Sequence, residues 1–410
     1  QCSNSLFHFH ESDFFFIQIL KNKGVCLCYF CHTFQMAGVY IHIPFCRKAC
    51  TYCDFHFSTQ LQNKNAFVEA LLHEIELQTH YINEPVTTIY FGGGTPSLLT
   101  AAEINTIIEK LNTVFKLDVK EITLEANPDN LTTSYLKELQ TTAVNRLSIG
   151  VQSFEEQRLQ WMNRSHTTQQ SVVAIESALQ IGFNVSADLI FALPEMSNDE
   201  WQKQLQKMIG LKPHHVSAYS LTLEERTVYH HQVAKKKIKE LNDVQSEAQF
   251  MLAHQLLSEA GYHHYEISNY ASDGHVAVHN SSYWKAEIYL GLGPSAHSFN
   301  GKTRQWNIRN NTAYIKSLHE GKLPFESEML TEVDSYNEYV MTRLRTDKGI
   351  DEKQWHKLLP ENHKVNLLAE MNELTGQKFL VRDASRIFIP LQHWYKADQI
   401  ISRLFATEIS

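Results

Sequence analysis

Short apolar runs alternate with longer amphipathic stretches from residue 39 to residue 225. The runs have the length and composition of strands, and the stretches between them follow a helical period. We expect strands at 39–43, 87–91, 121–126, 146–152, 185–193 and 215–221, and helices near 64–82, after Thr100, near 132–141, near 167–181 and after Ser197. Thr100 with Glu103, and Ser197 with Glu200, form capping-box patterns. This alternation indicates parallel βαβ units, so the predicted fold is α/β, a partial (βα)6 barrel.

Unusual residues gather where these strands end. Barrels of this kind place their chemistry on the loops at the carboxyl ends of the strands. Three cysteines follow the first strand, and glycines at 92–94 follow the second. Glu125 ends the third strand, Gln152 ends the fourth, and Asp188 lies on the fifth. Together they predict one functional face.

The cysteine loop admits three interpretations. A structural zinc site needs four ligands, so Cys46, Cys50 and Cys53 would need His42 or His56 as a partner. A redox dithiol would use only Cys50 and Cys53. An iron–sulfur cubane held by three thiolates keeps its fourth iron open for a substrate. We favour the cubane because it uses all three cysteines and needs no fourth ligand from the chain.

The spacing CxxxCxxC, led by YIHIPFC, resembles that of the radical S-adenosylmethionine (SAM) superfamily. The resemblance implies a radical SAM barrel with a [4Fe-4S] cluster on Cys46, Cys50 and Cys53, whose open iron binds SAM. GGGTPS at 92–97 is similar to the family's glycine stretch, and Glu125 to its ribose-contacting carboxylate. The implied SAM contacts are Tyr40, Tyr52, Gly93, Gly94, Thr95, Glu125, Gln152, Arg164 and Asp188. One departure is DLIFALPEM, with Ala192 and Glu195 where the family usually has glycines.

From about residue 37 to about residue 405 the chain resembles the coproporphyrinogen III oxidase-like group, and most closely its haem-chaperone branch. The oxidase has a further cysteine two positions after the third, where this chain has Phe55. HNSSYW at 279–284 matches the HNxxYW motif of the chaperone branch.

The resemblance implies that haem is a ligand. His279 is the candidate axial ligand, and Tyr283 and Trp284 offer flat apolar faces to a macrocycle. Rival ligands are His263, His264, His275 and His297.

The expected function is that of a haem chaperone, which passes haem to an acceptor protein such as a membrane respiratory enzyme. A flavodoxin or ferredoxin is the expected electron donor, and a homodimer is left open. The alternative is an enzyme, the oxygen-independent coproporphyrinogen III oxidase. The SAM residues do not discriminate between the two, whereas the missing cysteine counts against the oxidase.

The flanking regions complete the predicted organisation. Residues 1–35 lack a periodic pattern, and we expect them to be a non-native or disordered extension upstream of Met36. Cys26, Cys28 and Cys31 within them leave a second metal centre open. Residues 37–225 form the expected core and 226–329 a connecting region. Residues 330–410 fit a small winged-helix-like α+β domain that covers the barrel mouth or meets a protein partner.

Composition narrows the class of protein. Hydrophobic residues make up 43% of the chain and charged residues 20%, and the net charge is −8. No basic arm or stripe is present, so nucleic acid is not an expected partner. The clustered cysteines are unlike a secreted disulfide framework and favour the reducing cytoplasm.

Overall fold

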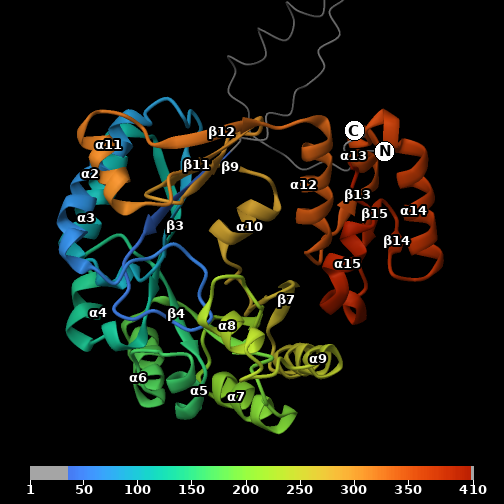
Figure 1. The fold of residues 1–410 in the computed structure, drawn as a ribbon, viewed down its shortest axis with the longest axis horizontal. Coiled ribbons are helices and arrows are strands. Elements are labelled where there is room, and N and C mark those ends of the chain that lie inside the picture. Colours follow the sequence, from blue (N-terminus) through green and yellow to red (C-terminus); the bar gives the residue numbers. More distant parts are fainter. Residues whose placement is uncertain (1–35, 408–410) are drawn as a thin grey trace, which may run out of the picture. The chain divides into compact units, whose positions relative to one another are not determined.

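A computed structural model describes residues 36–407. Its centre is a twelve-stranded sheet, in which six parallel strands lie side by side in chain order (Figure 1). These are β1 (Ala37–Ile43), β2 (Val86–Gly93), β3 (Leu117–Ala126), β4 (Arg146–Gln152), β5 (Asn184–Phe191) and β6 (His215–Ser220). The predicted α/β fold with a partial parallel barrel is therefore confirmed.

Helices join these strands in the order that the sequence predicts. They are α2 (Lys64–Leu77), α3 (Ala101–Val114), α4 (Thr133–Leu139), α5 (Glu156–Trp161), α6 (Thr168–Ile181) and α7 (Asn198–Leu211). The short α5 has no counterpart among the predicted helices. Thr100 and Glu103 form the predicted capping box. At Ser197 only half of it forms, because the Glu200 carboxylate is engaged by Arg158 instead.

The two faces of β1 differ in chemistry. Val39, Ile41 and Ile43 are fully buried among apolar neighbours. Tyr40 and His42 alternate with them and therefore point to the opposite, inner face of the sheet. This inner face carries the polar residues described below.

Residues 226–329 extend the sheet at both edges. β7 (His263–Glu266) and β8 (Asn269–Ala271) continue it beyond β6. β9 (Ile288–Leu292) pairs in parallel with β1 and is followed outward by β10 (His297–Phe299), β11 (Thr303–Asn307) and β12 (Phe325–Met329). The helices of this region are α8 (Val228–Ala234), α9 (Asp243–Glu259), α10 (Val278–Trp284) and α11 (Asn311–His319).

The carboxyl-terminal region packs beside α10 and α9, at the right of Figure 1. It comprises α12 (Glu332–Leu344), α13 (Glu352–Leu358), α14 (Lys364–Gly376), α15 (Ala397–Ser402) and a three-stranded sheet of β13 (Ile350–Asp351), β14 (Val381–Asp383) and β15 (Arg386–Phe388). α12 packs against α10, and the backbone of Ile267 donates to the carbonyl of Arg345. A 3-10 helix, Leu391–Lys396, precedes α15 and continues into it.

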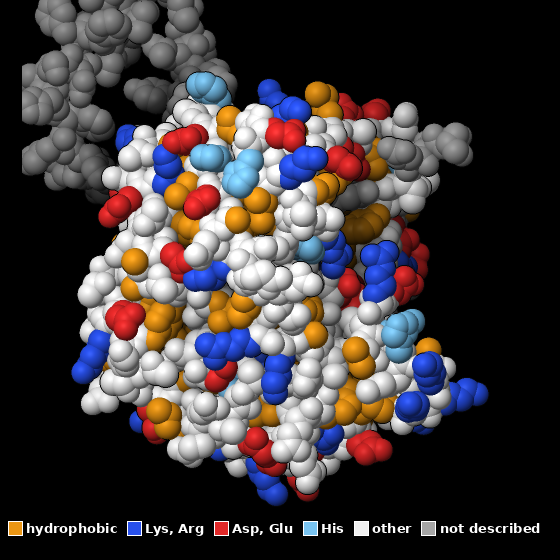
Figure 2. All heavy atoms as spheres, turned by 60° about the vertical axis from the view of Figure 1, so that its left-hand side comes forward, with side chains coloured by type: hydrophobic (Ala, Val, Ile, Leu, Met, Phe, Trp, Pro, Cys, Tyr) orange, Lys and Arg blue, Asp and Glu red, His pale blue; other side chains and the backbone are white. Residues whose placement is uncertain are grey.

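Surface charge is mixed on the face in Figure 2, where Lys and Arg side chains are interspersed with Asp and Glu. Within residues 36–407, none of the helices has the length and apolar character needed to cross a bilayer. The expected extension and its cysteines, Cys26, Cys28 and Cys31, lie outside the described residues.

Candidate functional site

The cysteine loop follows β1 and is held by its neighbours. The backbone of Cys46 donates to the Ser58 carbonyl at 3.0 Å, and that of Thr51 donates to the Met162 carbonyl at 3.1 Å. Cys46, Cys50 and Cys53 are all half-buried free thiols. Burial raises the pKa of Cys46 to about 11 and that of Cys53 to about 12. Without a metal the loop therefore keeps these two thiols protonated, so binding metal would release protons.

The loop fits a multinuclear cluster better than a single zinc ion. Among residues 36–407, no three His, Cys, Asp or Glu side chains converge closely enough to hold one metal ion. His42 is not a spare fourth ligand, because its Nε2 donates to the His56 carbonyl at 2.8 Å and its Nδ1 pairs with the Tyr40 hydroxyl at 3.1 Å. His56 itself pairs with Asn311 at 2.7 Å. Three thiols on one partly open loop match the ligand set of a cubane with an open iron.

Polar groups surround the thiols. Thr95 Oγ1 donates to Cys46 Sγ at 3.4 Å, and Arg164 Nη1 lies 3.5 Å from both Cys50 Sγ and the Tyr52 hydroxyl. Thr95, Tyr52 and Arg164 were predicted as SAM contacts. Thr95 and Arg164 border the cysteine loop, and Tyr52 lies within it. The guanidinium supplies positive charge where bound thiolates would be negative.

The glycine run packs against the cysteine loop. Gly93 has a φ of +105°, and a Cβ there would approach the His42 ring to 2.6 Å. A Cβ on Gly94 would lie 2.7 Å from the Phe45 carbonyl oxygen. The backbone of Gly94 donates to the Ile43 carbonyl at 2.9 Å. Close backbone packing between β2 and the end of β1 thus requires these glycines, whether or not they also contact a ligand.

Glu125 lies on the inner face among other polar side chains. It accepts hydrogen bonds from the Tyr90 hydroxyl at 2.8 Å and from the Gly93 backbone at 3.2 Å. Burial, with the nearby charge of Asp188, raises the pKa of Glu125 to about 7. Burial likewise raises the pKa of Asp188 to about 6. Tyr40 stacks on Tyr90 with ring centroids 6.0 Å apart, so Tyr90 connects two predicted residues, Tyr40 and Glu125.

Gln152 and Arg164 lie at the end of β4. Gln152 sits at a register shift between β4 and β5 and has a φ of 65°, which is uncommon for a residue other than glycine. Arg164 Nη2 donates to Asn127 at 2.7 Å and to the Gly150 carbonyl at 2.8 Å. Its Nε is buried without a hydrogen-bond partner among the described residues.

His279 is buried and its ring is fully engaged. Nδ1 pairs with Thr88 Oγ1 at 2.8 Å, Nε2 pairs with the Tyr283 hydroxyl at 2.9 Å, and the residue is 1% exposed. Burial lowers the pKa of His279 to about 3, so the ring is neutral. Ligating iron through it would break one of these buried hydrogen bonds. Trp284 points elsewhere in the fold, beneath the guanidinium of Arg345.

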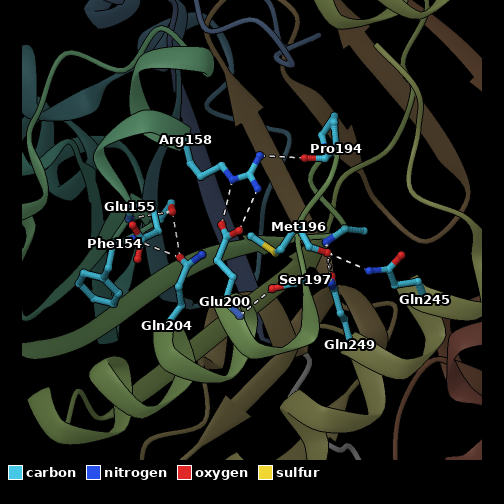
Figure 3. Close-up of polar contacts among 12 residues, drawn as sticks. Phe154, Glu155, Arg158, Pro194, Met196, Ser197, Glu200, Gln204, Gln245 and Gln249 are labelled. Carbon is cyan, nitrogen blue, oxygen red and sulfur yellow. Dashed lines mark hydrogen bonds and ion pairs between the residues drawn. The ribbon is translucent and has the colours of Figure 1, made fainter.

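The loop after β5 has two residues in the left-handed backbone conformation, and neither of them is a glycine. Ala192 and Glu195 have φ values of 58° and 60°, in the left-handed region that favours glycine. Side chains hold the loop in place (Figure 3): Arg158 binds Glu200 through two nitrogens and donates to the Pro194 carbonyl, each at 2.8 Å. Gln249 accepts from the Ala192 backbone and donates to the Met196 carbonyl, both at 2.9 Å, and Gln245 donates to that carbonyl at 3.0 Å.

Comparison with known proteins places the chain in a family. Residues 40–208 match the model of the Radical SAM superfamily. Heme chaperone HemW from Bacillus subtilis is 34% identical, over 78% of this chain and 86% of that protein. The chain belongs to the HemW family. Another relative is Radical S-adenosyl methionine domain-containing protein 1, mitochondrial, of Danio rerio, 33% identical over 85% of this chain and 82% of its own length.

A solved structure shares the fold of this chain. Coproporphyrinogen III oxidase HemN from Escherichia coli superposes with a TM-score of 0.78 and 23% identity, over 91% of this chain and 90% of its own. The sequence resemblance to the coproporphyrinogen oxidase-like group, nearest to its chaperone branch, is confirmed. Membership of the radical SAM superfamily implies a [4Fe-4S] cluster and SAM.

One residue of the inner face, Tyr90, was not among the predicted site residues. Tyr90 lies between Tyr40 and His279, 5.1 Å from the His279 ring, and binds Glu125. The sequence offered one signal for Tyr90: in TIYF it alternates with Ile89 and Phe91, which are buried, so it points to the opposite, inner face of the strand.

Proposed function

We propose that this chain is a haem chaperone that holds a [4Fe-4S] cluster, SAM and haem, and delivers the haem to an acceptor protein. The carrying observation is the 34% identity to a protein named heme chaperone over most of both chains. The match covers 78% of this chain, whereas the Radical SAM model covers only residues 40–208. The similarity therefore extends well beyond the SAM-binding part, which is common to proteins with unrelated reactions. The acceptor that we propose is a membrane respiratory enzyme, with a flavodoxin or ferredoxin as electron donor and the reducing cytoplasm as the location.

In this proposal Cys46, Cys50 and Cys53 hold the cluster, and the half-buried loop leaves one side open to SAM. The cluster would supply an electron to the bound sulfonium. Arg164 would offset the negative charge of the thiolates, because its guanidinium lies 3.5 Å from Cys50 Sγ. Thr95 would donate to the Cys46 sulfur, as it does here.

The inner face would hold SAM beside the cluster. Glu125 would accept hydrogen bonds from ribose hydroxyls, and these bonds would be strongest when the carboxylate is ionised. The Tyr90 hydroxyl and the Gly93 backbone already aim donors at this carboxylate and would keep it oriented. The remaining proposed contacts are Tyr40, Tyr52, Gly93, Gly94, Thr95, Gln152, Arg164 and Asp188.

The oxidase remains the second candidate, and one position disfavours it. Phe55, where the oxidase has a further cysteine, is 71% exposed beside the loop. An exposed phenyl ring provides an apolar contact and no metal ligand.

Anaerobic reconstitution followed by two parallel assays tests the proposal. The reconstituted chain should bind haem stoichiometrically, and it should not release CO₂ from coproporphyrinogen III when SAM and a reductant are present. Transfer of the bound haem to apo-myoglobin would show that this chain can release its haem to another protein, as delivery requires. Decarboxylation without haem binding would replace the proposal with the oxidase.

A further inference from the structure

A cavity of about 430 Å³ opens beside the cysteine loop, where β1 and β9 end; we call it the β1–β9 cavity. Its walls include Phe55, Tyr283, Tyr289, His56, His297 and Arg309. A second hollow of about 430 Å³ adjoins it and shares Tyr289 and His297. Cavities of this size hold cofactor-sized ligands when apolar walls are combined with a few polar groups.

Building on the proposed function, we propose that the β1–β9 cavity is the haem site, with His297 as the axial ligand and Arg309 as the partner of a propionate. Haem combines a flat apolar macrocycle, an iron that accepts an imidazole nitrogen, and carboxylates on its edge. The cavity presents aromatic rings, an imidazole and a guanidinium together. Each part of the ligand therefore meets a group of matching chemistry.

Hydrogen bonding singles out His297 among the histidines of the cavity. His42 uses both ring nitrogens, and His56 has Nε2 paired with Asn311, which leaves only Nδ1. The His297 ring is partly exposed, and both of its nitrogens are without a hydrogen-bond partner among the described residues. Its nitrogen can bind iron without breaking an existing contact.

The histidines outside the cavity are less suited to this role. His279 and His264 are buried, with both ring nitrogens paired. His263 Nε2 lies 3.1 Å from an Asp347 carboxylate oxygen, and His275 packs on the ring of His214, with centroids 4.3 Å apart. His297 is therefore the rival ligand that the geometry favours.

The surroundings of His297 suit an axial ligand. Partial burial and the charge of Arg304 lower its pKa, which keeps the imidazole neutral near physiological pH. Neutral imidazole is the form that ligates metals. The Trp306 ring lies behind it, with centroids 6.2 Å apart and planes 32° apart.

Arg309 connects the cavity to the cysteine loop. One guanidinium nitrogen donates to the carbonyl of Asp54, the residue after Cys53, and lies 3.8 Å from the Asp54 carboxylate. The guanidinium is about half exposed and keeps other donors for a propionate, which it can bind in a planar, bidentate way. Phe55, on the same loop, offers an apolar surface to the macrocycle.

In this arrangement His279 of the HNxxYW motif does not ligate the haem iron, although the sequence predicted that it would. Tyr283 lines the cavity, and His279 holds the Tyr283 hydroxyl at 2.9 Å from behind. His279 is thus a positioning residue for the wall of the cavity.

Titrations of the full chain, loaded with cluster, test the assignment with two ligands: ferric haem and iron-free protoporphyrin IX. His297→Ala should weaken ferric haem at least tenfold and shift its Soret band, while leaving the affinity for protoporphyrin unchanged. Free imidazole should restore the band in His297→Gly. Arg309→Leu should weaken both ligands. His263→Ala, an exposed histidine outside the cavity, is the matched control and should resemble wild type.

The outcomes separate this assignment from the proposed function. Wild-type protein that binds neither ligand would refute both. Wild-type binding that His297→Ala and Arg309→Leu leave unchanged would refute the cavity and leave the chaperone proposal standing. Equal losses of haem and protoporphyrin in His297→Ala, with no rescue by imidazole, would show that His297 is a wall residue and overturn its role as ligand.

Discussion

Replacing Glu125 with glutamine should change how the free energy of unfolding depends on pH. The folded-state pKa of Glu125 is about 7, against an ordinary value of 4.5. A shift of this size corresponds to a change of roughly 3 kcal/mol in the free energy of unfolding between low and high pH. We expect a stabilisation of about 2 kcal/mol for the protonated form, because the half-buried carboxylate keeps some hydration. Because the folded-state pKa is raised, this stabilisation is fully present below about pH 4.5 and is lost as the pH rises through about 7.

The Glu125→Gln variant has no ionisable group at this position, and it loses one hydrogen bond. The introduced glutamine side chain can still accept from Tyr90, but its amino group faces the Gly93 N–H, at a cost of about 1 kcal/mol. The variant should therefore be less stable than wild type by about 1 kcal/mol near pH 5, and more stable by about 1 kcal/mol near pH 8.

Urea denaturation at about pH 5, 6, 7 and 8, without SAM and at equal cluster content, measures this difference. Glu326→Gln, on the exposed strand β12, removes the same charge from the surface and is the control. A difference between Glu125→Gln and wild type that stays constant from pH 5 to pH 8 would refute the reasoning.

Four further predictions, one of them with its own control substitution, test other parts of the structure. Cys53→Ser should abolish the visible absorption of the reconstituted cluster, since two thiolates remain for a cubane; an unchanged spectrum with full iron content would contradict this. Glu125→Ala should weaken SAM about ten- to hundredfold by anaerobic calorimetry, and equal affinity would remove the residue from the site. Glu195→Gly should raise the free energy of unfolding by about 1 kcal/mol, because its φ is 60°. Asn83→Gly, where φ is not positive, should give no gain, and equal effects would contradict the argument. Thr100→Ala should lower that free energy by about 1 kcal/mol in urea denaturation, and no change would mean that the cap is redundant.

The barrel was predictable because its strands are short and largely apolar, and because the helices between them recur in order, four of them with a side-chain N-cap. The strands at the sheet edges were not, since β8 and β10 have three residues each and are defined by their partners. The surroundings of His279 were also hidden, because Thr88 lies far from it in the sequence and no local pattern joins them. The departures at Ala192 and Glu195 were visible in the sequence, whereas their left-handed backbone required the structure.

The pairing of β1 with β9 has a consequence for how the chain folds. Ala37 pairs with Ile288, so most of the chain must be synthesised before this edge of β1 is covered. Contacts so distant in sequence slow folding, and an uncovered strand edge invites pairing with other chains. The wall of the β1–β9 cavity likewise cannot exist until β9 has docked. We therefore expect nascent chains truncated before Ile288 to aggregate, and haem binding in the cavity to require that β9 has been synthesised and has docked.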